Sequence, residues 1–470
     1  MKLHFLNSAK SLIRQNVWLL VVMSIWYLSM FPGSLPFDSS EAIRMIQRNQ
    51  TIDWWSATYF WFLKITSIHG ATIAISSAIG YLVLVLTLSY FVFSFSTISR
   101  LTLRRARLVL VATPIVSVFG LTVSHDVFII SGILLILGTE YRFFTNMMTN
   151  QRLTINYIVG GILLTNTRAF PVYLAGLAVS LLLKRKVKLM ALVSVLLILL
   201  FSVSHVGIER DKNYTFIHVL SDIKCVVQHK ETKLSTNESE FLSRIAPLDR
   251  WKRLSQCSNI EKLVRDLDPN YKELNWNKEF VENYVKIVSK SPAILMQAKL
   301  QRSVVALPPP FFFTIPRNMV SSDLSKPIGL DTNWSLQENG PGLLHPSIDE
   351  ISVNNRFRGQ DLIRTPALAG IYMVNQASWF WGWGGLWLWP TLLIPFFMLR
   401  ISRVLRLLEM NFPIIILHAS TIAIGPASEA RHVGATIIAG ISLSTIYVLS
   451  KLEARRTFSL RDKREVLETR

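Results

Sequence analysis

The sequence predicts an all-α polytopic membrane protein, in which a bundle of about ten transmembrane helices carries a mainly helical external domain. Three observations support this fold class. The 470-residue chain is 50% hydrophobic and 11% aromatic, and its mean hydropathy of +0.36 is typical of a polytopic membrane protein. Its basic residues cluster beside apolar segments. One long polar segment separates two groups of apolar ones.

The basic clusters predict the topology, because Lys and Arg mark the cytoplasmic side of a membrane protein. We therefore place the N-terminus and four clusters in the cytosol: Arg100 to Arg107, Lys184 to Lys188, Arg400 to Arg406, and Lys451 to Arg470. These clusters account for the formal net charge of +20 better than a basic surface for nucleic acid does.

Between these anchors the apolar segments form a path with both termini in the cytosol. The first span, at about 17–31, has no small-residue cleavage site and is expected to stay as a transmembrane helix. Further spans are expected at 71–97, 108–123, 127–144, 154–166, 170–184, 189–206, 379–400, 411–427 and 433–451. Several are shorter than roughly 20 residues, so the region 108–184 can include half-helices packed inside the bundle.

The same pattern divides the chain into four parts. Residues 1–206 form an N-terminal transmembrane bundle whose first external loop is 32–69. Residues 207–377 form an external, extracytoplasmic domain with stretches of helical apolar spacing. Residues 378–452 supply the C-terminal transmembrane helices, and 453–470 form a basic cytosolic tail.

The two cysteines, Cys225 and Cys257, both fall in the predicted external domain. An even number of cysteines in an oxidising compartment favours a structural disulfide between them. Two unpaired buried thiols are the alternative.

Ionisable residues recur at the predicted external face, and ionisable groups at a membrane boundary are candidates for function. They are Asp38 and Glu41 after the first span, His125 and Asp126 in the tightest external turn, Arg168 in the next turn, and Glu429, Arg431 and His432 between the last two spans. Each also has a structural interpretation. Asp38 and Asp126 can cap helices, and the arginines can anchor the chain at the interface. Their convergence on one face favours a site.

Such a site suits chemistry on a lipid-linked substrate. A carboxylate can remove the proton from an acceptor hydroxyl. Arginine can hold the phosphate of a lipid-linked donor through charge-assisted hydrogen bonds.

The run PGSLPFDSSE (Pro32 to Glu41) follows the first span and precedes two short surface helices and a long span. In this order it resembles the GT-C superfamily of integral-membrane glycosyltransferases, and most of all the bacterial branch with a PG…DS first external loop. Enzymes of this superfamily use polyprenyl-phosphate-linked sugars. The resemblance implies a GT-C-like bundle in which Asp38 is the catalytic base.

The resemblance extends to other external turns. Asp126, in LTVSHDVFIISG, matches a second acidic residue and is a candidate ligand for Mg or Mn. TNTRAFPVY (Arg168) and GPASEARHVGA (Arg431) resemble basic positions near the lipid phosphate, with His125 and His432 beside this donor site and Glu41 and Glu429 in support. In the second surface helix, where members of this superfamily tend to have a His-Pro pair, this chain has DWWSATYFWF. Asp53 in this run is a candidate supporting carboxylate.

We therefore expect a membrane glycosyltransferase that moves a sugar from a polyprenyl-phosphate donor to an extracytoplasmic acceptor, with inversion and with Asp38 as general base. The acceptor is a cell-envelope glycan, lipid or polymer, and the protein is a multi-pass protein of the cell membrane. A transporter or flippase, a polymerase or ligase of lipid-linked glycans, and a non-catalytic assembly subunit are the alternatives. A transporter would show internal repeats, which the sequence lacks.

Overall fold

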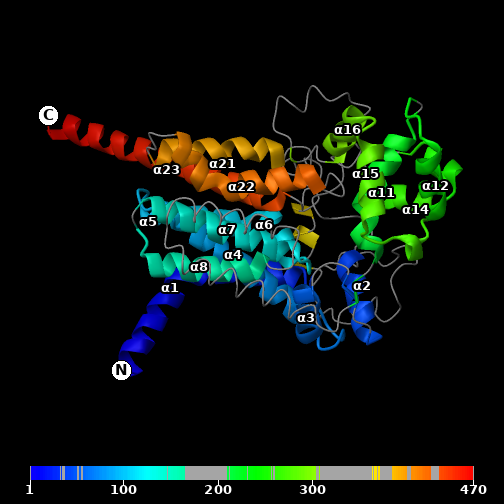
Figure 1. Ribbon diagram of the computed structural model, residues 1–470. Helices are drawn as coiled ribbons and strands as arrows, with labels where there is room; N and C mark the ends of the chain where they lie inside the picture. Colours follow the sequence, from blue (N-terminus) through cyan, green and yellow to red (C-terminus); the bar gives the residue numbers. More distant parts are fainter. Residues whose placement is uncertain are drawn as a thin grey trace.

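The computed structural model is mainly helical over the residues that it describes (Figure 1). These are residues 2–31, 33, 37–49, 52–53, 57–145, 147–164, 209–210, 212–229, 231–255, 257, 260–302, 306, 362–363, 365–367, 369–370, 384–399, 404–424 and 433–468. For part of them, including Asp38, Glu41 and Asp53, only the backbone is described.

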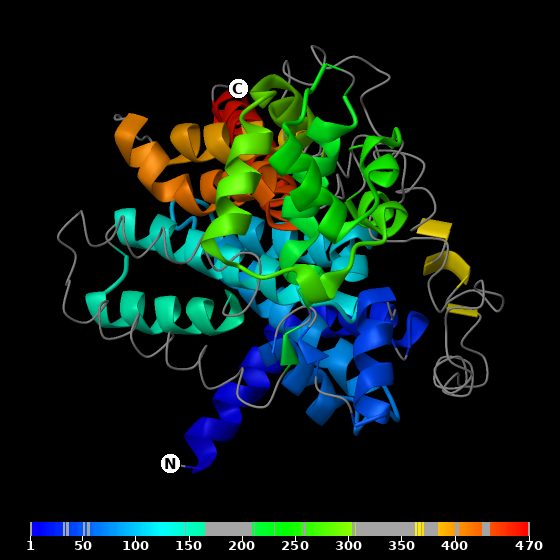
Figure 2. The same cartoon turned by 45° about the vertical axis from the view of Figure 1, so that its right-hand side comes forward.

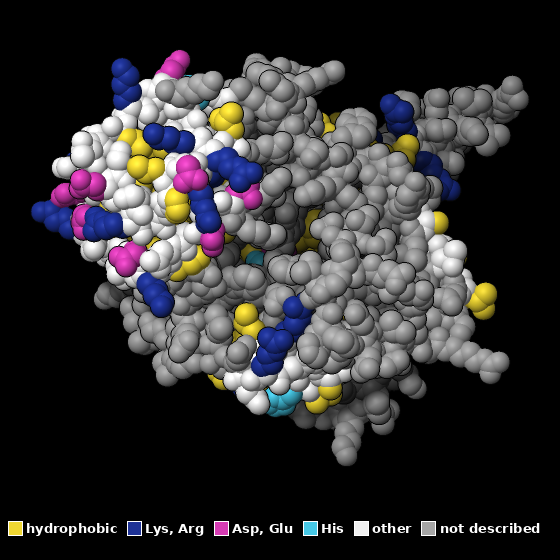
Figure 3. All heavy atoms as spheres, turned by 90° about the vertical axis from the view of Figure 1, so that its right-hand side faces the viewer, with side chains coloured by type: hydrophobic (Ala, Val, Ile, Leu, Met, Phe, Trp, Pro, Cys, Tyr) yellow, Lys and Arg dark blue, Asp and Glu magenta, His cyan; other side chains and the backbone are white. Residues whose placement is uncertain are grey.

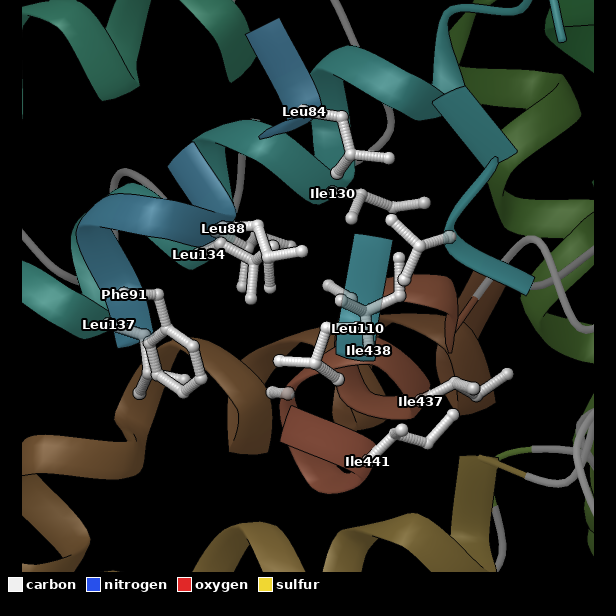
Figure 4. Packing of buried hydrophobic residues seen from close by; sticks show 14 of the residues in the cluster. Leu84, Leu88, Phe91, Leu110, Ile130, Leu134, Leu137, Ile437, Ile438 and Ile441 are labelled. Atoms are coloured by element: carbon white, nitrogen blue, oxygen red, sulfur yellow. The ribbon is translucent and has the colours of Figure 1, made fainter. Parts of the chain in front are cut away.

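One set of helices forms a bundle around a continuous apolar core. It comprises α1 (Lys2–Ser29), α4 (Ala74–Val92), α5 (Arg100–Ala112), α6 (Pro114–Leu121), α7 (Asp126–Phe144), α8 (Asn150–Leu164), α21 (Gly384–Met398), α22 (Val404–Ile424) and α23 (Gly434–Glu468). At its centre, Leu88 of α4, Leu110 of α5, Leu134 of α7 and Ile438 of α23 are fully buried (Figure 4). Helices from the first and last thirds of the chain therefore share one core.

Three of the described helices are long and apolar enough to cross a membrane: Ala74–Val92, Asp126–Phe144 and Gly434–Arg456. Shorter apolar helices cover Asn16–Ser29, Gly384–Met398 and Leu407–Ile422. These findings indicate membrane association, and the finer expectation of about ten spans is not established by them. The predicted spans at 170–184 and 189–206 lie outside the described residues.

The expected span at 108–123 is divided between two helices, which fits the expectation that the region 108–184 can include half-helices. α5 ends at Ala112 and α6 begins at Pro114, with Thr113 extended between them. Proline lacks an N–H and its ring clashes with the preceding turn, so it starts helices more readily than it continues them. The short helix α6 is buried over most of its length.

The outer surface of the bundle is apolar where a water-soluble protein would carry polar residues. On α4, Ile75, Leu82 and Leu86 are 44%, 49% and 59% exposed and lie along one stripe, and on α1 Trp18 is 70% exposed. Large contiguous apolar surfaces mark contact with a membrane or a partner.

Both termini lie at one end of the bundle, away from the second set of helices (Figure 1). The start of α5 is at this end too, since Glu453 of α23 accepts hydrogen bonds from Ser99 and Thr102. Ser99 is also the N-cap of α5, and its side chain accepts from the Thr102 N–H. The basic residues of α5 thus lie near the terminal helix.

A second set, here called the distal helices, has its own core. It comprises α11 (Lys212–Val227), α12 (Thr236–Ile245), α13 (Leu248–Lys252), α14 (Ile260–Leu267), η1 (Tyr271–Glu273), α15 (Lys278–Val288) and α16 (Pro292–Arg302). Trp251 is fully buried in this core, and its indole N–H donates to the Leu242 carbonyl at 3.0 Å. Cys225 and Cys257 are joined by a disulfide, with Cα atoms 5.8 Å apart.

A buried charge pair connects the first and last of the distal helices. Asp222 of α11 and Arg302 of α16 are each 2% exposed, and Arg302 Nη1 lies 2.7 Å from Asp222 Oδ1. Lys299 Nζ lies 3.0 Å from the other carboxylate oxygen, and Arg302 Nε donates to the Cys257 carbonyl at 2.8 Å. Each buried charge is thus compensated, as the desolvation penalty requires.

The last distal helix is also tied to the bundle. His418 of α22 is buried, with Nδ1 2.7 Å from the carbonyl oxygen of Ala306 and Nε2 2.9 Å from Thr436 Oγ1 of α23. A carbonyl can only accept, so Nδ1 carries the proton and Nε2 accepts from Thr436. This histidine therefore joins the chain just after α16 to two bundle helices.

The helices α2 (Phe37–Gln47) and α3 (Ala57–Thr66) lie together at the end of the bundle that faces the distal helices, below the distal helices in the view of Figure 1 (Figures 1 and 2). They share a small core in which Ile43 and Ile46 of α2 pack with Phe60 and Leu63 of α3. Two short strands, β1 (Ile52–Asp53) and β2 (Glu209–Arg210), pair in parallel, with Asp53 opposite Arg210. The first loop is thereby joined to the start of the distal helices.

Candidate functional site

The chain turns sharply where it leaves α1. Gly33 has a φ of +126°, and its N–H donates to the Met30 carbonyl at 2.7 Å. A Cβ at this position would lie 2.6 Å from the Cβ of Ser77 on α4 and 3.2 Å from the Leu121 carbonyl oxygen. Only glycine combines this dihedral with so close an approach. The turn at Gly33 therefore holds the start of the first loop in close contact with α4 and with the end of α6.

The helix α2 begins at Phe37, four residues after this turn. Asp38 is its second residue, so it lies inside the first turn of the helix and not at the N-cap position that its structural interpretation requires. The side chains of Asp38 and Glu41 lie outside the described part of the structure. The next residue, Ser39, is 1% exposed, and its hydroxyl lies 2.9 Å from that of Tyr59.

Tyr59 of α3 connects α2 with the turn before α7. Its ring centroid lies 5.8 Å from that of His125, with the planes at 65°. Phe128 of α7 lies 6.4 Å from Tyr59 and 4.9 Å from Phe62. These edge-to-face contacts fix the pair of surface helices on the N-terminal end of α7.

The turn itself holds a buried carboxylate. Asp126 is 3% exposed and His125 is 7% exposed. The Ser124 hydroxyl donates to Asp126 Oδ2 at 2.9 Å, and His125 Nε2 lies 3.7 Å from Oδ1. Asp126 is also the first residue of α7, with His125 at the N-cap position, so the N-terminal end of the helix dipole favours its negative charge.

The structure thus brings together two of the segments that the sequence indicates as parts of a functional site. The helix that carries Asp38 and the turn that carries His125 and Asp126 meet through Tyr59. Asp53 lies on β1. Four further candidates fall outside the described residues: Arg168, Glu429, Arg431 and His432.

Three residues of this site were not predicted: Ser39, Tyr59 and Ser124. Ser124 carries a recognisable signal, since a serine two residues before an aspartate can bond it locally. Ser39 and Tyr59 carry none, because their contact joins two segments whose spatial relation the sequence pattern does not specify.

The site contains the carboxylate of Asp126, held by Ser124, beside the imidazole of His125. The aromatic rings of Tyr59 and Phe128 lie next to this pair. Such a carboxylate can accept a hydrogen bond from a hydroxyl or bind a cation. Within the ranges given above, no group of three or more His, Cys, Asp or Glu side chains gathers as metal ligands do. His125 and Asp126 by themselves do not complete a divalent metal site.

The face of the molecule formed by the distal helices carries charges of both signs (Figure 3). Comparisons with known proteins assign no family: no protein-family model, no curated protein and no solved structure matches the chain.

Proposed function

We propose that the chain is a membrane glycosyltransferase of the GT-C type. It takes a sugar from a polyprenyl-phosphate donor in the membrane and transfers it to an acceptor outside the cytoplasm, which is a cell-envelope glycan, lipid or polymer. The reaction inverts the anomeric carbon. The site faces the extracytoplasmic side of the cell membrane, and both termini are cytosolic.

One observation carries this proposal. Contacts from Ser39 through Tyr59 to His125 connect the first-loop helix, on which Asp38 lies, with the turn that holds the buried carboxylate of Asp126, and this connection supports the proposal. An enzyme that transfers a sugar from a lipid phosphate needs a base for the acceptor and polar groups for the donor in one place. The apolar outer surface of α4 and α1 supports a donor that arrives from the membrane.

In the proposed mechanism, Asp38 accepts the proton of the acceptor hydroxyl while the acceptor oxygen attacks the anomeric carbon in line. The bond from that carbon to the phosphate oxygen breaks, and polyprenyl phosphate leaves with the electron pair. A phosphate is a stable leaving group, so no general acid is required. Asp38 then releases its proton to water.

The donor side of the site is assigned to Arg168, Arg431, His125 and His432, which would bind the phosphate and its developing charge. Glu41, Asp53 and Glu429 support the arrangement. Asp126 is the residue that a divalent ion, Mg or Mn, would contact, and such an ion would stabilise the leaving phosphate. Because the described ligands do not complete a metal site, every step above is assigned to protein groups alone.

The test is transfer of a labelled sugar from polyprenyl phosphate donors by the purified protein in nanodiscs. Asp38→Asn keeps the size of the side chain and removes its basicity, so we expect turnover to fall by ~10²–10⁴-fold with an unchanged melting curve. Glu41→Gln, on the same helix, is the comparison variant and should lower turnover less than Asp38→Asn does, because Glu41 has only a supporting role. Tyr59→Phe should lower turnover less than Asp38→Asn, because it removes the hydroxyl that contacts Ser39 and leaves the ring beside His125.

Near-normal transfer by a folded Asp38→Asn protein would remove Asp38 from the mechanism. Movement of the intact lipid-linked sugar across the membrane, without any transfer to acceptors, would instead identify a flippase.

A further inference from the structure

The helix α3 has two apolar faces, and just one of them packs against protein. Tyr59, Phe60 and Leu63 are 5%, 3% and 0% exposed and form the small core with α2. On the opposite side, Trp61 and Ile65 are 37% and 74% exposed. Residues four apart lie on the same side of a helix, so these two side chains form an outward stripe. A helix that faces water on one side normally carries polar residues there.

The turn after α3 adds a third apolar side chain to this surface. Ile68 is 56% exposed and has a φ of +52°, a dihedral that is strained for a β-branched residue. The strained turn is held by Ser67, whose hydroxyl accepts from the Gly70 N–H at 2.9 Å and whose carbonyl accepts from the Thr72 N–H at 3.0 Å. The chain thus maintains an exposed isoleucine in an unfavourable backbone conformation.

Basic groups border the apolar stripe. Lys64 Nζ lies 4.9 Å from the centroid of the Trp61 ring, and Arg48 and His69 are exposed at the ends of α2 and α3. Tryptophan beside a lysine whose stem covers apolar surface is typical of the boundary between hydrocarbon and lipid headgroups.

The stripe also lies near the exposed apolar surface of the next helix, because Thr66 Oγ1 at the end of α3 is 2.7 Å from Ser76 Oγ at the start of α4. α4 follows the turn directly, and its exposed stripe begins at Ile75 and continues through Leu82 and Leu86. α4 is one of the three helices long and apolar enough to cross a membrane. An apolar surface that lies near that of such a helix, and that has cations along its border, is best matched by the bilayer itself.

We infer that α3 is an interfacial anchor: Trp61, Ile65 and Ile68 insert into the lipid at the headgroup boundary, and Lys64 contacts the phosphates of anionic lipids. This inference concerns how the protein sits in the bilayer and does not depend on the proposed glycosyl transfer. Its consequence for the site is direct. Because Tyr59 on the inner face of α3 packs on His125, the depth of α3 fixes the level of the His125–Asp126 turn relative to the lipid phosphates.

Spin-label accessibility in nanodiscs tests the anchor. The native cysteines are joined to each other, so one introduced cysteine is a unique labelling position. Ile65→Cys is compared with Leu254→Cys in the distal helices, because both side chains are 74% exposed in the protein. We expect the label at position 65 to collide more with oxygen, which concentrates in lipid, and the label at 254 to collide more with a water-soluble nickel chelate. Ile68→Cys should behave like Ile65→Cys.

Equal nickel accessibility at positions 65 and 254 would overturn the inference, since the stripe would then face water. Low accessibility to both oxygen and nickel would also overturn it, because a protein partner would then cover the stripe. In a second measurement, anionic lipid should move the label at 68 deeper than zwitterionic lipid does, and Lys64→Gln should abolish the difference. No difference between the lipids would refute the role of Lys64.

Discussion

Gly33 shows how a single residue positions the first loop. It combines a positive φ with a backbone that approaches Ser77 more closely than a Cβ permits. Its neighbour in this region, Tyr27 of α1, donates to the Ala74 carbonyl at the start of α4 at 3.0 Å. The exit of α1 is thus fixed on α4 before the chain enters α2.

We expect Gly33→Ala to destabilise the protein. Backbone strain at a positive φ costs about 1–3 kcal/mol, and the clash with Ser77 adds to it. Thermal unfolding in detergent should therefore show a lower midpoint. Adding Ser77→Gly should recover part of the loss, because it removes the clash and leaves the strained dihedral. An alanine variant as stable as the wild type would show that the turn relaxes without cost.

At this scale the sequence identified part of the site. Pro32-Gly33 and the acidic residues after it can be recognised locally, and so can Asp126 beside Ser124. The contact of Ser39 with Tyr59 could not be predicted, because it depends on how α2 folds back on α3. The side-chain positions of Asp38 and Glu41, and the placement of Arg168 and Arg431, stay predictions, since they lie outside the described residues.

Among the elements, α11 carries a histidine in an environment that opposes its protonation. The pKa of His218 is lowered to about 4, mainly by burial; the nearby positive charges of Arg302 and Lys299 act in the same direction, and Asp222 acts in the opposite direction. The folded protein therefore keeps this imidazole neutral at pH values where an unfolded chain, with an ordinary histidine pKa of about 6.5, would bind a proton.

The distal helices should accordingly lose stability as the pH falls. Between about pH 6.5 and 4 the unfolded state binds more protons than the folded one, so the free energy of unfolding decreases with falling pH. The His218 contribution is present in full above pH 6.5 and is lost by about pH 4, at roughly 3 kcal/mol in total. The hydrogen-exchange protection factors of α11, which correct for the pH dependence of the intrinsic exchange rate, should fall over this range in the wild type, and His218→Gln should reduce that decrease. Identical profiles for both proteins would contradict the assignment.

The sequence predicted most described elements but not the position at which one apolar run divides into two helices. Apolar runs marked α4, α7 and α23, and helical spacing marked α14 and α15. The run at 108–123 is uniformly apolar, so hydropathy alone did not reveal that α5 and α6 are separate. The break at Pro114 was a local signal that the apolar composition obscured.

At the scale of the whole molecule, the two ends differ both in the elements that form them and in their charged residues. The termini and the basic helix α5 lie at one end, and the distal helices lie at the other (Figure 1). The positive-inside pattern predicts that the first end is cytosolic, and the apolar outer surface lies between the two ends.

Thiol labelling of intact cells tests this orientation. An impermeant maleimide added from outside should label Leu254→Cys, and should label Arg105→Cys, an exposed position on α5, only after the membrane is made permeable. Labelling of position 105 in intact cells would reverse the topology. The wild-type protein treated with the same maleimide is the control and should remain unlabelled, because its two cysteines are joined in a disulfide.

The pairing of Asp222 with Arg302 imposes an order on biosynthesis. A ribosome makes Asp222 80 residues before Arg302, whereas Cys225 and Cys257 are separated by 32 residues. In the proposed orientation, the disulfide can therefore form while the nascent chain is still crossing the translocon, but α11 cannot bury its carboxylate until α16 supplies Lys299 and Arg302, because an unpaired buried charge is too costly. Chains stalled before residue 299 should thus be oxidised yet open to protease at α11, and protection of α11 in such chains would show that Asp222 is compensated without α16.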